Sequence, residues 1–136
     1  MRPIAIDTNA YASFKRGSTP IVEVIQHSPH MLISVTVLGE LLSGFAAGNQ
    51  EHSNRRELTQ FIHVPRVTVV ACTAATADIY ALVYAALRRK GQPIPSNDMW
   101  IAASCLEHGA ALLTLDAHFQ NIDGLRVGQS LEDFIP

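Results

Sequence analysis

The sequence predicts a single α/β domain, residues 1–136, with a parallel β-sheet flanked by helices on both faces. Short apolar runs bounded by turn residues alternate along the chain with longer segments whose apolar residues recur at helical spacing. Hydrophobic residues make up 48% of the 136 positions, which is enough for one substantial core. No internal repeat, low-complexity tract or linker divides the chain, so we expect one domain.

The expected elements alternate from the first residues to the last. They are a strand at 3–7, a helix at 19–26, a strand at 31–33, a helix at 36–46, a helix at 51–63, a strand at 67–70, a helix at 73–90, a helix from about 98 to 109 and a strand at 110–115. Thr8 and Asn9 follow the first strand as turn or helix-start residues.

Turn and cap residues support these boundaries. Ser28-Pro29 interrupts the chain before the second strand, and Gly91 ends the long helix. Ser96 and Asn97 are good N-cap residues for the next helix, which places Asp98 in its first turn. The residues expected on the buried face of the long helix are Ala77, Tyr80, Ala81, Tyr84 and Leu87.

Composition excludes several classes of protein. Ten Lys and Arg against twelve Asp and Glu leave a formal charge of −2, so the chain lacks the global basic surface of many nucleic-acid binders. Cys72 and Cys105 show no CxxC spacing, so a zinc ribbon or a disulfide framework is not indicated. Residues 67–87 are apolar but contain Asp78, which costs roughly 2.5–3.5 kcal/mol inside a membrane. With no export signal at the first residues, we expect a cytoplasmic protein without a membrane span.

Four carboxylates each lie at the edge of an apolar segment. Asp7 ends the first strand, and Asp116 follows the last apolar run. In parallel sheets, ligands bind beyond the carboxyl ends of strands, so these two acids are expected to share a pocket. Glu40 lies one turn after Thr36 on its helix, off the apolar stripe, and Asp98 lies at a helix start.

Such a cluster suits a hard divalent cation. Mg²⁺ and Mn²⁺ take oxygen ligands, whereas the six histidines show no zinc spacing. Carboxylates held close together without a metal ion repel one another, and at least one resists ionising. A bound cation removes that penalty and activates water for phosphodiester hydrolysis.

Four ordered segments extend the pattern over nearly the whole chain. They are Ile6-Asp7-Thr8-Asn9, Ser34-Val35-Thr36 leading to Glu40, Asn97-Asp98 with Ile101-Ala102-Ala103, and Leu113-Thr114-Leu115-Asp116 with His118-Phe119. Each segment is weak evidence alone, but the ordered set is specific. In this set the chain resembles the PIN-domain ribonucleases, and among them the VapC toxins of toxin–antitoxin pairs.

The resemblance implies a metal-dependent endoribonuclease with a PIN-like domain. Asp7, Glu40, Asp98 and Asp116 would hold Mg²⁺ or Mn²⁺, directly or through water. Asn9, Thr36 and Thr114 would orient those ligands or the attacking water. The family also implies an RNA substrate, a homodimer and a cognate VapB-like antitoxin that inserts a segment into the acidic site.

Two rival functions stay open. The first is a catalytically inactive PIN-like module that binds a partner protein through the acidic pocket. The second is a phosphate-handling enzyme with Asp7 as nucleophile, although enzymes of that kind carry a second acid two residues later, where this chain has Asn9. Dinucleotide binding is not indicated, because no GxGxxG follows the first strand.

Several other residues have structural readings that we favour over functional ones. The cations Arg88, Arg89 and Lys90 suit a helix C-terminus as well as RNA. Trp100 is expected in the core or an interface rather than against a base. His118 is left outside the catalytic set.

Overall fold

A five-stranded, all-parallel sheet forms the centre of the molecule, in the order β3-β2-β1-β4-β5. The computed structural model describes all residues from 1 to 136. The strands are β1 (Ile4–Ile6), β2 (Met31–Ser34), β3 (Val67–Val70), β4 (Ala111–Leu113) and β5 (Val127–Gly128). The predicted single α/β domain with a parallel sheet is therefore confirmed.

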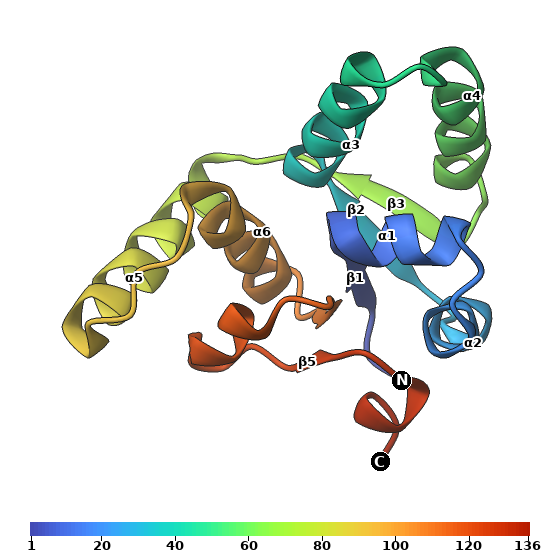
Figure 1. Ribbon diagram of the computed structural model, residues 1–136. Helices are drawn as coiled ribbons and strands as arrows, with labels where there is room; N and C mark the ends of the chain where they lie inside the picture. The colour runs from blue at the N-terminus through green and yellow to red at the C-terminus, as the bar shows by residue number, and fades with distance from the viewer.

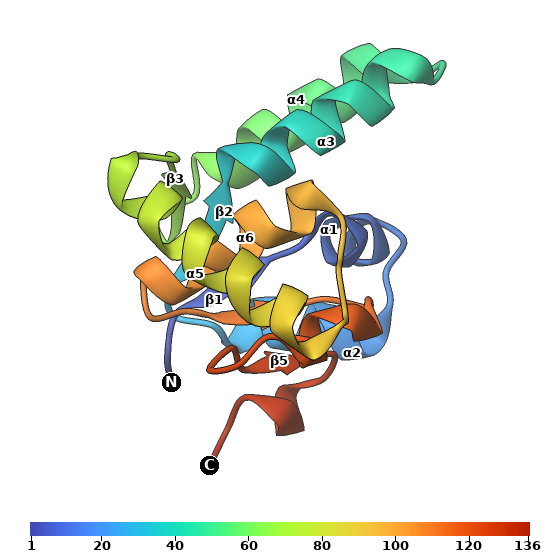
Figure 2. The ribbon, with the colours of Figure 1, turned by 90° about the vertical axis from the view of Figure 1, so that its left-hand side faces the viewer.

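Helices cover both faces of the sheet, as predicted (Figure 1). They are α1 (Thr8–Lys15), α2 (Thr19–His27), α3 (Val35–Ala47), α4 (Glu51–Ile62), α5 (Ala74–Lys90) and α6 (Ser96–Glu107). The first four follow β1 and β2 and lie on one face, whereas α5 and α6 pack together on the other. Helices α3 and α4 form a hairpin that projects beyond the sheet (Figure 2). None of the helices is long and apolar enough to cross a membrane.

The three central strands are buried on both faces. Every residue of β1, β2 and β4 is buried, which explains why they appear in the sequence as continuous apolar runs without alternation. The core continues into the helices through large side chains such as Ile21, Leu87 and Phe119, all nearly inaccessible to solvent. A rigid sheet of this kind fixes the positions of the residues that follow its strands.

The path of the chain creates a switch point between β1 and β4. From β1 the chain moves to β2 and β3 on one side, and then returns to β4 and β5 on the other side. The register pairs Ile6 with Leu113, so the two strands end side by side. In open α/β sheets this is where ligands bind. Asp7 and Thr114 are the residues that come next.

Four elements were not predicted. Helix α1 begins directly after β1, where the sequence indicated only helix-start residues at Thr8 and Asn9. The strand β5 and the 3-10 helices η1 (Ala117–Asn121) and η2 (Leu131–Asp133) are each of five residues or fewer. Elements this short bury too few residues to show a period in the sequence.

The predicted buried face of α5 is right for two of its five residues and wrong for the other three. Leu87 is buried and Tyr80 is half-buried against the core, whereas Ala77, Ala81 and Tyr84 are exposed, Tyr84 by 45%. The helix also buries Thr76 and Val83, which were not predicted. Alanine and large apolar residues occur all around α5, so its sequence does not single out one face. Contacts with α6 decide the orientation, and the Thr76 hydroxyl donates a hydrogen bond to Glu107 Oε1 at 2.5 Å.

The predicted cap of α6 also differs. Pro95 occupies the N-cap position, and the helix begins at Ser96 without a side-chain cap. The Ser96 hydroxyl instead pairs with the Tyr80 hydroxyl at 3.1 Å. Asn97 turns toward Glu40 on α3, so both supposed cap residues make tertiary contacts.

Candidate active site

Asp7 is the most buried of the four predicted acids. It is 4% exposed and serves as the N-cap of α1, where its Oδ1 accepts a hydrogen bond from Thr8 N at 2.8 Å. Its own backbone N–H donates to Leu113 O, which fixes the residue against β4. The side chain therefore has one orientation, set by the strand before it and the helix after it.

Thr114 joins Asp7 to Asp116. The buried Thr114 hydroxyl donates to Asp7 Oδ2 at 2.6 Å and accepts from Asp116 N at 3.0 Å. Asn9 Oδ1 accepts from Leu115 N at 3.0 Å, which ties the same turn to α1. Two of the three predicted supporting residues, Asn9 and Thr114, thus hold the acidic strand ends in place.

Glu40 reaches the same region from α3. Its Oε1 accepts a short hydrogen bond from the Thr8 hydroxyl at 2.5 Å, and Asn97 Nδ2 donates weakly to Oε2 at 3.4 Å. These two partners come from the N-terminal turns of α1 and α6. Glu40 therefore links three helices at the mouth of the site.

Asp98 and Asp116 meet at His118. His118 Nε2 lies 2.5 Å from Asp98 Oδ2, and His118 Nδ1 lies 3.1 Å from Asp116 Oδ1. One ligand atom from each of these residues lies within 4.8 Å of the other two. The structure thus puts His118, which the sequence reasoning left outside the catalytic set, between two of the acids.

The pKa values show that the four acids share one electrostatic environment. Burial raises the pKa of Asp7, and the negative charges of Asp98 and Glu40 raise it further, whereas the hydrogen bonds from Thr114 and Thr8 lower it. Burial also raises the pKa of Asp98. The negative charges of Asp116 and Glu40 raise this pKa further, whereas His118 lowers it. The charges of Glu40 and Asp116 therefore act on the two more buried acids, Asp7 and Asp98.

A divalent cation fits part of this set of donors. Asp98 and Asp116 supply oxygen atoms and His118 a nitrogen that Mn²⁺ also accepts, all within 4.8 Å of one another. Asp7 and Glu40 lie outside that group and act on it through their charges. Neither lysine nor arginine forms an ion pair with any of the four acids, whose mutual repulsion is opposed only by His118 and neutral donors. The cluster has the chemistry of a metal site rather than of a salt-bridge network.

Thr36 makes no hydrogen bond with any of the four acids. Its hydroxyl has one partner, the Cys72 Sγ at 3.8 Å, and its side chain lines an open cleft beside Glu40. Thr8, Asn97 and His118 make the contacts with the acids that sequence reasoning missed. Their sequence positions could have indicated this, because Thr8 follows Asp7, Asn97 precedes Asp98 and His118 comes two residues after Asp116.

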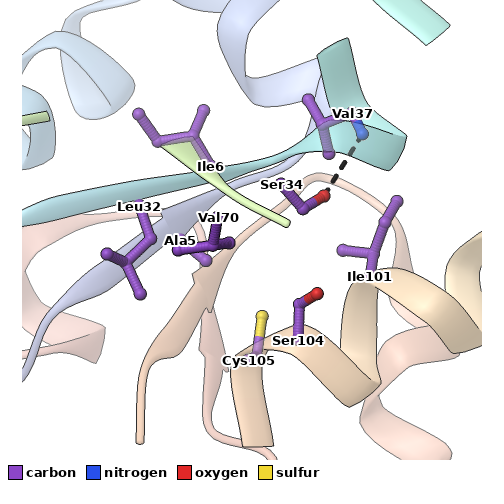
Figure 3. A pocket seen from close by; sticks show the side chains of 9 residues that line it. All are labelled: Ala5, Ile6, Leu32, Ser34, Val37, Val70, Ile101, Ser104 and Cys105. Atoms are coloured by element: carbon purple, nitrogen blue, oxygen red, sulfur yellow. Dashed lines mark hydrogen bonds between the residues drawn. The ribbon is translucent and has the colours of Figure 1, made fainter. Parts of the chain in front are cut away.

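A small space beneath the site lies between α6 and the sheet (Figure 3). Its volume is about 10 Å³, which is room for about one water molecule and excludes a substrate. Ser104 Oγ lies there, buried and without a hydrogen-bond partner in the chain. Burial, with the charge of Asp7, raises the pKa of the neighbouring Cys105 thiol to about 12. This thiol is therefore a packing group, not a nucleophile.

Comparisons with known proteins agree with this geometry. The PIN domain model matches residues 4–125. The chain is 31% identical over 126 residues to ribonuclease VapC1 of Rickettsia felis, covering 91% of this chain and 93% of the relative. It is 30% identical over 95 residues to ribonuclease VapC4 of Mycobacterium tuberculosis, covering 70% and 73%. The crystal structure of DNA-bound VapBC from Salmonella typhimurium superposes with a TM-score of 0.79 at 26% identity, over 94% of this chain and 98% of that one. The chain therefore belongs to the PIN-domain family, in its VapC branch.

Proposed function

We propose that this protein is the toxin of a toxin–antitoxin pair and a metal-dependent endoribonuclease. The observation that carries the proposal is the convergence of Asp7, Glu40, Asp98 and Asp116 at the switch point of the sheet, without a lysine or arginine to neutralise them. Two relatives of the chain are named as ribonucleases, which supports RNA as the substrate.

The four acids would hold Mg²⁺ or Mn²⁺, either directly or through water. When bound, the cation would offset the charge that develops on the scissile phosphate and make a water molecule more acidic. Asp98 and Asp116 present ligand atoms close together, and Asp7 lies behind them, joined to Asp116 through Thr114. His118 would orient Asp98 and Asp116 before the cation binds.

The chain's own groups would then arrange the hydrolysis of one phosphodiester bond. Glu40 Oε2 lies on the wall of the open cleft, where it can accept a proton from the water that attacks the phosphorus atom. The Thr8 hydroxyl holds the other oxygen of Glu40 in place. The bond to the 3′ oxygen breaks, and the phosphate stays on the downstream fragment.

A cognate antitoxin and a second copy of the chain are the partners we expect. Tyr11, Leu41 and Phe45 line a hollow of about 200 Å³ between α1, α3 and α4, and the polar residues Lys15, Asn54 and Glu57 complete its lining. A hollow with both apolar and charged walls suits an amphipathic segment of a partner protein. The matched Salmonella structure is of a VapBC complex, which supports a VapB-like antitoxin here. We place the protein in the cytoplasm because it belongs to the VapC branch of the family.

The decisive experiment is the mapping of cleavage ends in total bacterial RNA incubated with purified protein and Mn²⁺. The Asp7→Asn and Asp98→Asn variants serve as controls for contaminating nucleases, with circular dichroism to confirm their fold. Discrete ends from the wild-type protein alone would establish the activity and identify the RNA that is cut. Identical ends from wild type and both variants would refute it and favour the inactive, partner-binding module.

A further inference from the structure

The small space between α6 and the sheet contains an unexplained polar group. Its walls come from β1, β2, β3, α3 and α6, and every residue that lines it is buried (Figure 3). Seven of the nine lining residues are hydrophobic. The volume of about 10 Å³ is close to the minimum that holds one water molecule. The polar residues among the nine decide whether water is stable there.

Ser104 presents a hydroxyl group to this space. The residue is 4% exposed, and its Oγ is the only buried side-chain oxygen or nitrogen in the chain without a hydrogen-bond partner. A hydroxyl that leaves water on folding and gains no partner destabilises the folded state. Buried polar groups of native proteins are therefore nearly always paired, with protein or with ordered water. Ser104 needs a partner that the chain itself does not supply.

Ser34 lines the same space from the end of β2 (Figure 3). Its Oγ accepts a hydrogen bond from Val37 N at 3.2 Å and so caps α3, whereas its own hydroxyl hydrogen is donated to no group in the chain. The buried Cys105 thiol is a third and weaker polar group in the lining. A buried water molecule typically makes two to four hydrogen bonds, and these three groups are enough for it.

We infer that this space binds one structural water molecule, hydrogen-bonded to Ser104 Oγ on α6 and to Ser34 Oγ at the junction of β2 and α3. The water would pair the unsatisfied Ser104 hydroxyl and use the free hydrogen of Ser34. It would also link α6, which carries Asp98, to the start of α3, which carries Glu40. The inference goes beyond the proposed function and needs neither RNA nor a metal ion.

The variant Ser104→Ala tests the water site through the sign of its effect on stability. If the hydroxyl holds a water molecule, alanine removes a satisfied hydrogen bond and the Tm falls. If the space is dry, alanine removes an unpaired polar group and the Tm rises. Alanine also favours the helix, so Ser43→Ala is the matched control, because Ser43 lies inside α3 with an exposed side chain. Ser104→Ala should melt at least about 3 °C below Ser43→Ala.

A double-mutant cycle tests whether one water molecule joins the two serines. Ser34→Ala should lower the Tm by itself, because it also removes the cap bond to Val37 N. In that background the water has already lost one partner, so adding Ser104→Ala should lower the Tm by less than it does in the wild type. Equal effects of Ser104→Ala in the two backgrounds would show that no water bridges the two hydroxyls.

A high-resolution crystal structure of the protein gives the direct answer. One water molecule should lie within about 3.2 Å of both Ser104 Oγ and Ser34 Oγ. A dry space, or a Ser104 side chain turned to a backbone carbonyl of α6, would overturn the inference, as would a Ser104→Ala variant that melts at or above Ser43→Ala. None of these measurements depends on cleavage of RNA, so failure of the proposed function would leave the water site standing, and the reverse also holds.

Discussion

Thr114→Val tests whether one buried hydroxyl holds the acidic site together. Valine keeps the shape of threonine and removes the hydroxyl that donates to Asp7 Oδ2 at 2.6 Å and accepts from Asp116 N at 3.0 Å. Thr114 is 2% exposed, so water does not readily replace these bonds. Two polar groups lose a partner at once.

The expected loss follows from the two bonds. A hydrogen bond to a charged group contributes about 1.5–3 kcal/mol and a neutral one about 0.5–1.5 kcal/mol, so the sum is about 2–4.5 kcal/mol of unfolding free energy. For a domain of this size, that corresponds to a fall in Tm of roughly 8–16 °C. The loss should be larger near neutral pH than in acid, because the Thr114 hydrogen bond lowers the pKa of Asp7 and so stabilises its ionised form.

The assay is thermal denaturation of the metal-free protein at neutral and acid pH, followed by titration with Mn²⁺. Thr36→Val is the matched control, since the Thr36 hydroxyl has only Cys72 Sγ at 3.8 Å as a partner. That control should cost less than about 0.5 kcal/mol. Equal stabilities for the two variants, or a Thr114→Val loss that is the same at both pH values, would refute the reasoning.

Three further predictions concern charge, reactivity and packing. Metal-free Asp7→Asn should be at least as stable as the wild type near neutral pH. Burial and the charges of Asp98 and Glu40 raise the pKa of Asp7, so ionised Asp7 lowers the stability of the folded wild type above that pKa. The stability advantage of the variant should therefore shrink as the pH falls through that pKa. Denaturation curves across the pH range measure this, and an advantage that grew in acid would contradict it. Cys72 should react with a thiol reagent in the native protein while Cys105 does not, because Cys72 is exposed and the buried Cys105 thiol has its pKa raised to about 12. Mass spectrometry of the labelled peptides measures this, and equal labelling of the two cysteines would count against the burial of Cys105. Gly128→Ala should lower the Tm measurably, because its Cβ would lie 2.4 Å from Asp133 Cβ and 2.8 Å from Phe134 Cζ, whereas Gly39→Ala, with no such neighbour, should not.

The local pattern of the chain is sufficient for most of the fold. The predicted strands and helices from residue 19 to residue 113 are all present, because buried strands appear as short apolar runs and helices as apolar residues at helical spacing. The buried face of α5 could not be predicted from the spacing of its apolar residues. Its alanines lie on several sides, and only the packing of α6 selects the side with Val83 and Leu87.

The acidic site divides in a similar way. Position at a strand or helix end identified Asp7, Asp98 and Asp116 as candidates, and position beside the apolar stripe of its helix identified Glu40. The structure brings all four into one electrostatic environment. The residues that support these acids were harder to predict from the sequence. Thr114 donates to Asp7, and Asn9 accepts from Leu115 N in the turn before Asp116. Thr36 makes no hydrogen bond with an acid, and His118 lies between two of them although its sequence context looked ordinary.

The sequence alone determined the fold class and the candidate acids, because the spacing of apolar residues and the ends of apolar runs can be recognised from neighbouring residues. The hydrogen bonds around the acids and the buried face of α5 depend on distances between residues far apart in the chain. Thr114 and Asp7, for example, are 107 positions apart and 2.6 Å from one another across a hydrogen bond. Such distances arise only when the parallel sheet forms and brings the carboxyl ends of β1 and β4 together, so no local pattern encodes them.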